Sequence, residues 1–150
     1  MGLDMYLTRK HYVQKWDHNP IEEHYDVTVT KGGKPYVIEG RIQYVIELVG
    51  VWRKANQIHA WFVQNVQGGK DDCQESYVSH EQLNTLRNLC KAALADHEQA
   101  PFLLPTQPGF FFGGTDYDEY YFEDLEDTVK ILDFTLKHPE EHEMYYHASW

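Results

Sequence analysis

Cysteine, basic residues and long apolar runs are all scarce in this chain of 150 residues. The two cysteines, Cys73 and Cys90, lack metal-ligand spacing, so we expect free thiols in a reducing compartment. Thirteen lysine and arginine residues face 24 acidic ones, and the net charge of −11 argues against duplex nucleic acid as a partner. No apolar run approaches the roughly 20 residues of a membrane span, and the N-terminus has no signal-peptide layout. We therefore expect one soluble domain in the cytoplasm, with no membrane partner.

Short catalytic and cofactor motifs are missing as well. No G-x-S-x-G, H-E-x-x-H or C-x-x-C pattern occurs, so the usual hydrolase, zinc protease and redox signatures are absent. The glycines before residue 115 lack the lysine of a P-loop. The acidic stretch 116–124 lacks EF-hand spacing. Its acidic residues are explained by the first turn of a helix, where negative charge is favourable. The sequence predicts no metal and no cofactor.

Aromatic residues, in contrast, are abundant. Eleven tyrosines, seven phenylalanines and four tryptophans make up 15% of the chain. Aromatic rings bury large areas, and tyrosine and tryptophan keep a polar group as well. The composition therefore indicates either a core filled with rings or a pocket lined with them.

Strand patterns lie at both ends of the chain. Residues 3–13 alternate apolar and polar side chains, residues 41–50 are rich in β-branched residues, and residues 143–150 predict a last strand. Between them, Gly32 and Gly33 predict the turn of a hairpin. The run at 110–114 also favours a short strand. We expect the first and last strands to pair at the centre of the sheet.

Helical patterns occupy residues 51–66, 79–96 and 115–137. Ser79 with Gln82, and Thr115 with Asp118, have the spacing of capping boxes at two of the helix starts. The chain is therefore predicted to be a single α+β domain over residues 1–150, a small antiparallel sheet with about three helices packed on it.

The first predicted helix places polar side chains where a core is expected. At 100° per residue, His59 lies within the apolar stripe and Asn56 lies on its edge, whereas Trp61 points outward. An unpaired imidazole or amide inside a core costs on the order of 1–3 kcal/mol. Each side chain therefore needs a partner, a water molecule or a ligand.

The third predicted helix repeats this anomaly. Asp118 shares the apolar face with Tyr121, next to Tyr117. Asp118 either caps its helix or orients His59. Two interpretations stay open: a satisfied polar contact within the core, or the wall of a pocket.

Three long stretches resemble a family of small uncharacterised phage and prophage proteins. These are MGLDMYL at the start, WRKANQIHAWFVQNVQGGKDDC from residue 52, and LLPTQPGFFFGGTDYDEYY from residue 103. The resemblance covers most of the chain and implies a phage-encoded accessory protein in the bacterial host cytoplasm. It implies no activity, substrate or cofactor.

The leading functional hypothesis is a binding protein. It would hold a small polar ligand, such as a nucleotide or nucleotide-derived immune signal, in an aromatic-lined pocket. The candidate ligand-binding residues are Trp52, Arg53, Lys54, Asn56, His59, Tyr117, Asp118 and Tyr121.

Two alternatives come from other classes. The first is an inhibitor that binds a host protein through an acidic surface, with Trp61 as an exposed anchor. The second is a hydrolase or phosphodiesterase, with His59 as general base and Asp118 orienting it. The oligomeric state is left open.

Overall fold

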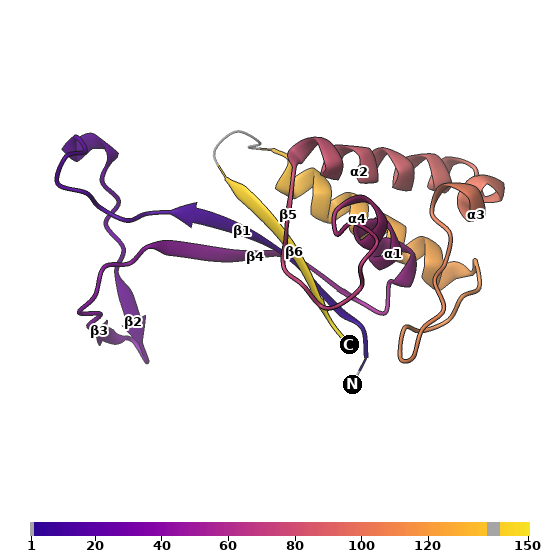
Figure 1. The fold of residues 1–150 in the computed structure, drawn as a ribbon, viewed down its shortest axis with the longest axis horizontal. Helices are drawn as coiled ribbons and strands as arrows, with labels where there is room; N and C mark the ends of the chain where they lie inside the picture. The colour runs from indigo at the N-terminus through magenta and orange to yellow at the C-terminus, as the bar shows by residue number, and fades with distance from the viewer. Residues whose placement is uncertain (1, 138–141) are drawn as a thin grey trace.

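The computed structural model describes residues 2–137 and 142–150 and shows a mixed α+β fold, which confirms the predicted class (Figure 1). The strands are β1 (Asp4–Tyr12), β2 (Val29–Lys31), β3 (Lys34–Tyr36), β4 (Tyr44–Arg53), β5 (Ser76–Val78) and β6 (Glu143–Ser149). The helices are α1 (Asn56–Asn65), α2 (His80–Ala95), α3 (Ala100–Leu103) and α4 (Glu119–Thr135), with 3₁₀ turns at Ile21–Glu23 and His97–Gln99. None of the helices in the described ranges has the length and apolar character needed to span a bilayer.

The main sheet is antiparallel, with the strand order β4-β1-β6-β5. The first and last strands are its central pair, as predicted, with Asp4 opposite Ser149. All the long helices lie on one side of this sheet (Figure 1). β5 has only three residues, too few for a sequence period to reveal it.

The prediction of a helix from residue 51 was wrong at its start. Val51, Trp52 and Arg53 continue β4, because they pair with Tyr6, Met5 and Asp4 of β1. Lys54 then turns the chain with a φ of 58°, and the helix begins at Asn56. Pairing with β1 overrides the helical period of the sequence.

The two later helices match their predicted positions more closely. Ser79 and Gln82 form the expected capping box of α2. Thr115 does not cap α4, however; the N-cap is Asp118, whose carboxylate accepts from the Tyr121 N–H at 3.1 Å. The helix ends at Thr135 rather than Lys137.

Residues 110–114 form a turn and not the short strand predicted for them. The Phe112 N–H donates to the carbonyl of Gly109, and Phe111 and Gly113 have φ values of 67° and 86°. Left-handed backbone at two positions interrupts strand geometry.

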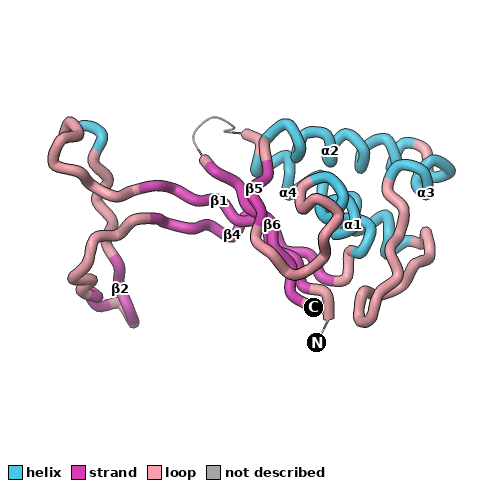
Figure 2. Tube along the Cα trace, in the orientation of Figure 1, coloured by secondary structure: helices cyan, strands magenta, loops and turns pink. Residues whose placement is uncertain are grey.

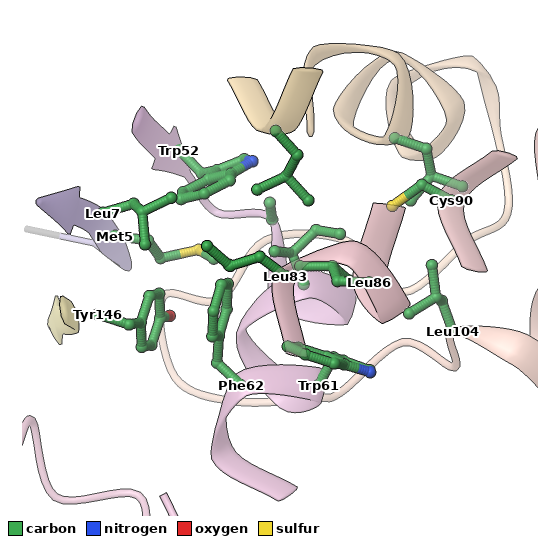
Figure 3. Packing of buried hydrophobic residues seen from close by; sticks show 14 of the residues in the cluster. Met5, Leu7, Trp52, Trp61, Phe62, Leu83, Leu86, Cys90, Leu104 and Tyr146 are labelled. Atoms are coloured by element: carbon green, nitrogen blue, oxygen red, sulfur yellow. The ribbon is translucent and has the colours of Figure 1, made fainter. Parts of the chain in front are cut away.

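The core lies between the helices and the covered face of the sheet. Figure 3 shows Phe62 of α1 beside Tyr146 of β6, and their rings stack with centroids 3.8 Å apart. Trp52 meets Phe62 edge-on, and its indole N–H donates to Thr128 of α4 at 2.8 Å. Aromatic rings thus fill much of the core.

Residues 13–43 form an arm that extends from one end of the β1–β4 ribbon, away from the helices (Figures 1 and 2). The arm carries the β2–β3 hairpin, in which Gly32 and Gly33 adopt positive φ as predicted. Within these residues Val13 alone is buried. The arm therefore has no core of its own.

Candidate functional site

A cleft of about 320 Å³ lies between the β4–α1 junction and the first turns of α4. Its volume is at the lower end of the range of small-molecule sites, roughly 300–1,000 Å³. The lining residues come from the end of β4, the start of α1, the loop before α4 and α4 itself: Arg53, Lys54, Asn56, Gln57, Gly113, Gly114, Asp116, Asp118, Tyr120, Tyr121 and Asp124.

Asn56 joins two walls of this cleft. Its amide N–H groups donate to the carbonyls of Phe112 at 3.0 Å and Gly114 at 2.8 Å. Its carbonyl oxygen accepts from the Gln107 N–H at 2.9 Å. The side chain is 1% exposed and fully bonded, so its polar groups hold the loop before α4 against α1.

The basic wall is formed by Arg53 and Lys54, where β4 ends. Arg53 lies 3.7 Å from the Asp4 carboxylate, and both side chains are well exposed. Lys54 holds a left-handed backbone, which costs a residue with a Cβ on the order of 1–2 kcal/mol. Backbone strain of this kind gathers at functional sites.

The acidic wall is formed by Asp116, Asp118 and Asp124. Burial raises the pKa of Asp124 to about 6, although a hydrogen bond from Gln57 opposes the shift. The Gln57 amide lies 3.3 Å from the Asp124 carboxylate and donates to the Tyr121 carbonyl as well. Carboxylates and cationic groups thus face a single cleft.

Five of the eight predicted ligand-binding residues line this cleft, at its junction and on α4: Arg53, Lys54, Asn56, Asp118 and Tyr121. Trp52 lies in the core, and His59 borders a different cavity. The Tyr117 hydroxyl accepts from the Thr106 N–H at 3.1 Å and so fixes the preceding loop.

Sequence reasoning missed Gln57, Asp116, Tyr120 and Asp124. Asp124 had a usable signal, because it follows Tyr117 and Tyr121 at helical spacing i, i+4, i+7. Gln57 had none, since it falls on the polar side of the helical wheel, yet it is 3% exposed.

His59 is a core residue with both ring nitrogens occupied. Nδ1 lies 2.6 Å from the Tyr146 hydroxyl, and Nε2 lies 2.9 Å from the Asp71 carboxylate. Asp71 also accepts from the Trp150 indole at 3.0 Å. The expectation that Asp118 orients His59 was therefore wrong, because Asp71 occupies that position. Burial lowers the pKa of His59, and Asp71 opposes the shift.

Trp61 was predicted to point outward, and this was wrong. It is 8% exposed and meets Phe62 edge-on. Residues 103–107 border its outer side together with α1. A helix covered on two sides has no polar face at that position, so a one-sided helical wheel misplaces the ring.

Comparisons of the chain with models of protein families, with curated proteins and with solved structures give no match. The resemblance to phage proteins therefore stays a prediction. Among residues 2–137 and 142–150, no cluster of three or more histidine, cysteine or acidic side chains is arranged to hold a metal ion. The protein is thus an α+β protein whose cleft is polar and lined by both acidic and basic side chains.

Proposed function

We propose that the protein binds a small polar ligand, a nucleotide or a nucleotide-derived signal, in the cleft between the β4–α1 junction and α4. The observation that carries the proposal is the pair of oppositely charged walls around one cavity of about 320 Å³. We propose further that the protein is phage-encoded, as its resemblance to phage proteins implies, and that it sequesters a host messenger.

A nucleotide suits both walls. Its phosphate is anionic and complements Arg53 and Lys54, whereas the N–H groups of a base are donors that a carboxylate accepts. Asp124 is less exposed than Asp116 and Asp118, and the Gln57 amide donates to its carboxylate at 3.3 Å. Tyr120 and Tyr121 add rings to the same lining, and aromatic faces stack on bases.

Two groups in the cleft lower the stability of the free protein. Lys54 holds a conformation that glycine adopts at no cost. Asp124 has a raised pKa because its charge is partly desolvated. Binding sites commonly retain groups of this kind, since they serve a ligand rather than the fold.

Thermal-shift and calorimetric titrations test the proposal. A panel of nucleoside monophosphates, cyclic dinucleotides, nucleosides and inorganic phosphate separates the contributions of base and phosphate. A ligand at 100 times its dissociation constant adds about 2.7 kcal/mol to the free energy of unfolding. We expect nucleotides to bind more tightly than either the nucleosides or phosphate.

Matched variants place the binding in this cleft. Lys54→Gln removes one charge from the basic wall, and Asp124→Asn removes one from the acidic wall. Lys130→Gln is the control, because Lys130 is an exposed lysine of α4 outside the cleft. We expect affinity losses of about tenfold or more for the two cleft variants, equivalent to 1.4 kcal/mol, and no loss for the control. Equal behaviour of all three, or no response across the panel, contradicts the proposal.

A second candidate is supported by the acidic face of α4. The side chains of Glu119, Glu123, Glu126 and Asp127 are all exposed, as expected for a surface that binds a basic host protein. The buried Trp61 is no longer its anchor. Recovery of a basic partner that is lost when Glu123 and Glu126 are both changed to glutamine, with the cleft variants unaffected, would favour this function.

A further inference from the structure

We propose that two copies of this chain associate through the free edge of β4, with the arm of each copy lying along the sheet edge of the other. β4 is an end strand of the main sheet, and β1 pairs with one side of it. In Figures 1 and 2, no described helix or strand runs along its other side. The N–H and C=O groups of an end strand are a template for another strand.

The exposed edge is apolar. Tyr44, Ile46 and Leu48 lie opposite Tyr12, Lys10 and Thr8 of β1 and share the sheet face away from the helices. Their exposed fractions are 42%, 57% and 57%.

The part of the edge before the β-bulge has little of the usual protection against pairing. Residues 44–52 contain no lysine, arginine or proline, the residues that commonly protect edge strands. The β-bulge opposite Leu7 and Thr8 kinks the strand beyond Leu48. The stretch available to a partner is therefore 44–48.

This stretch is complementary to itself. An antiparallel pair of two β4 strands, with its twofold axis at Ile46, places Ile46 opposite Ile46 of the second copy and Tyr44 opposite Leu48. Glu47, the only charged residue in the stretch, then lies opposite Val45, so like charges do not meet. Glu47 is moreover paired with Arg9 and His11 within its own chain. Residues 44–48 of a second copy can therefore pair with residues 44–48 of the first without placing like charges opposite each other.

The antiparallel direction decides where the arm goes. β4 runs from the arm to the body, so the arm of one copy continues beside residues 49–53 of the other. The arm, which has no core of its own, would then pack against the second copy. Ile21 and Val37 are 82% and 79% exposed in the single chain, and covering such side chains removes apolar surface from water, which favours association.

Charge allows this contact. Residues 13–43 contain four lysine or arginine residues and five acidic ones, a net charge of −1. The rest of the chain therefore carries −10 of the total of −11. Two strongly acidic bodies repel each other, and contact through a nearly neutral arm and edge keeps most of that charge apart. Five paired residues alone fall short of the roughly 800 Å² per partner in a stable interface, so the arm supplies the remaining area.

Sedimentation velocity over a wide concentration range tests the association. We expect a dimer for the wild type and a monomer for Ile46→Lys, which adds a charge to the paired edge. Phe102→Lys is the matched control, because Phe102 is 81% exposed and belongs to α3, which lies at the opposite end of the molecule from the arm (Figure 1). A monomeric wild type at every concentration, or loss of the dimer in Phe102→Lys alone, overturns the proposal.

A disulfide test identifies the register. Directly opposite residues in antiparallel strands have Cα atoms about 4.5–5.5 Å apart, within the range that a disulfide spans. In a Cys73→Ser background, Ile46→Cys should form a covalent dimer under mild oxidation. Tyr77→Cys lies at the exposed opposite edge of the sheet. After the same oxidation it should run as a monomer in non-reducing denaturing gel electrophoresis. Cross-linking of the Tyr77 variant but not the Ile46 variant assigns the association to β5 and refutes the β4 edge.

Discussion

Replacing Asn56 tests whether one buried amide holds the wall of the cleft. Asn56→Ala removes three hydrogen bonds, two to carbonyls and one from a backbone N–H. The Phe112 carbonyl is bonded within the core, whereas Gly114 and Gln107 are exposed and water can replace their partner. Allowing about 1–2 kcal/mol for the buried group and about 0.5–1 kcal/mol for each of the others gives a loss of about 2–4 kcal/mol.

Asn56→Asp makes the test stricter. The aspartate has nearly the same shape but directs an oxygen at two carbonyl oxygens, so we expect it to lose more stability than the alanine variant. Urea unfolding followed by tryptophan fluorescence measures both. Asn65→Ala is the control, because Asn65 is exposed and its side chain makes one local hydrogen bond, to the carbonyl of Trp61. If Asn56→Ala and Asn65→Ala differ by less than about 0.5 kcal/mol, the assigned role of Asn56 is refuted.

Three further predictions use the same unfolding assay. Burial lowers the pKa of His59 below 6.5, so near and below that pH the unfolded chain binds a proton on this imidazole more readily than the folded protein does. The difference in unfolding free energy between wild type and His59→Gln should therefore narrow as the pH falls below 6.5. A difference that stays constant with pH contradicts the burial argument. Asp124 has the opposite sign, because its pKa rises from 3.8 to about 6, so Asp124→Asn should be more stable than wild type above pH 6 and lose this gain towards pH 4. A Cβ at Gly50 would lie 2.6 Å from Ile131, so Gly50→Ala should cost about 1–3 kcal/mol, whereas Gly40→Ala, in open space, should change stability by less than about 0.5 kcal/mol.

Local patterns were enough to predict the elements whose period or capping is strong. The alternation in β1, the two glycines of the hairpin and the Ser79 capping box all act over a few residues, and each appears in the structure as expected. The inward direction of Asn56 and His59 was also predictable, because α1 keeps a helical period from residue 56 onward.

Contacts between distant segments account for the rest. The sequence pattern around Trp52 predicts a helix, but pairing with Met5 of β1 keeps Trp52 in β4. Asp71 comes from a loop without a periodic signal, so it was not foreseen as the partner of His59. Trp61 lines a pocket together with a segment about forty residues later in the chain, and a helical wheel does not include such a segment.

The central pairing of β1 with β6 has a consequence for the order of folding. The Thr8 hydroxyl donates to the carbonyl of Tyr145 across 137 residues of sequence, and the two central strands of the sheet meet at this separation. Contacts between such distant residues cost loop entropy and slow folding. During synthesis β1 leaves the ribosome before β4 and β6, and it has only the edge strand β4 as a neighbour until residues 143–149 follow. The main sheet is therefore completed after translation has passed β6, and β1 spends the interval with one side available to other chains.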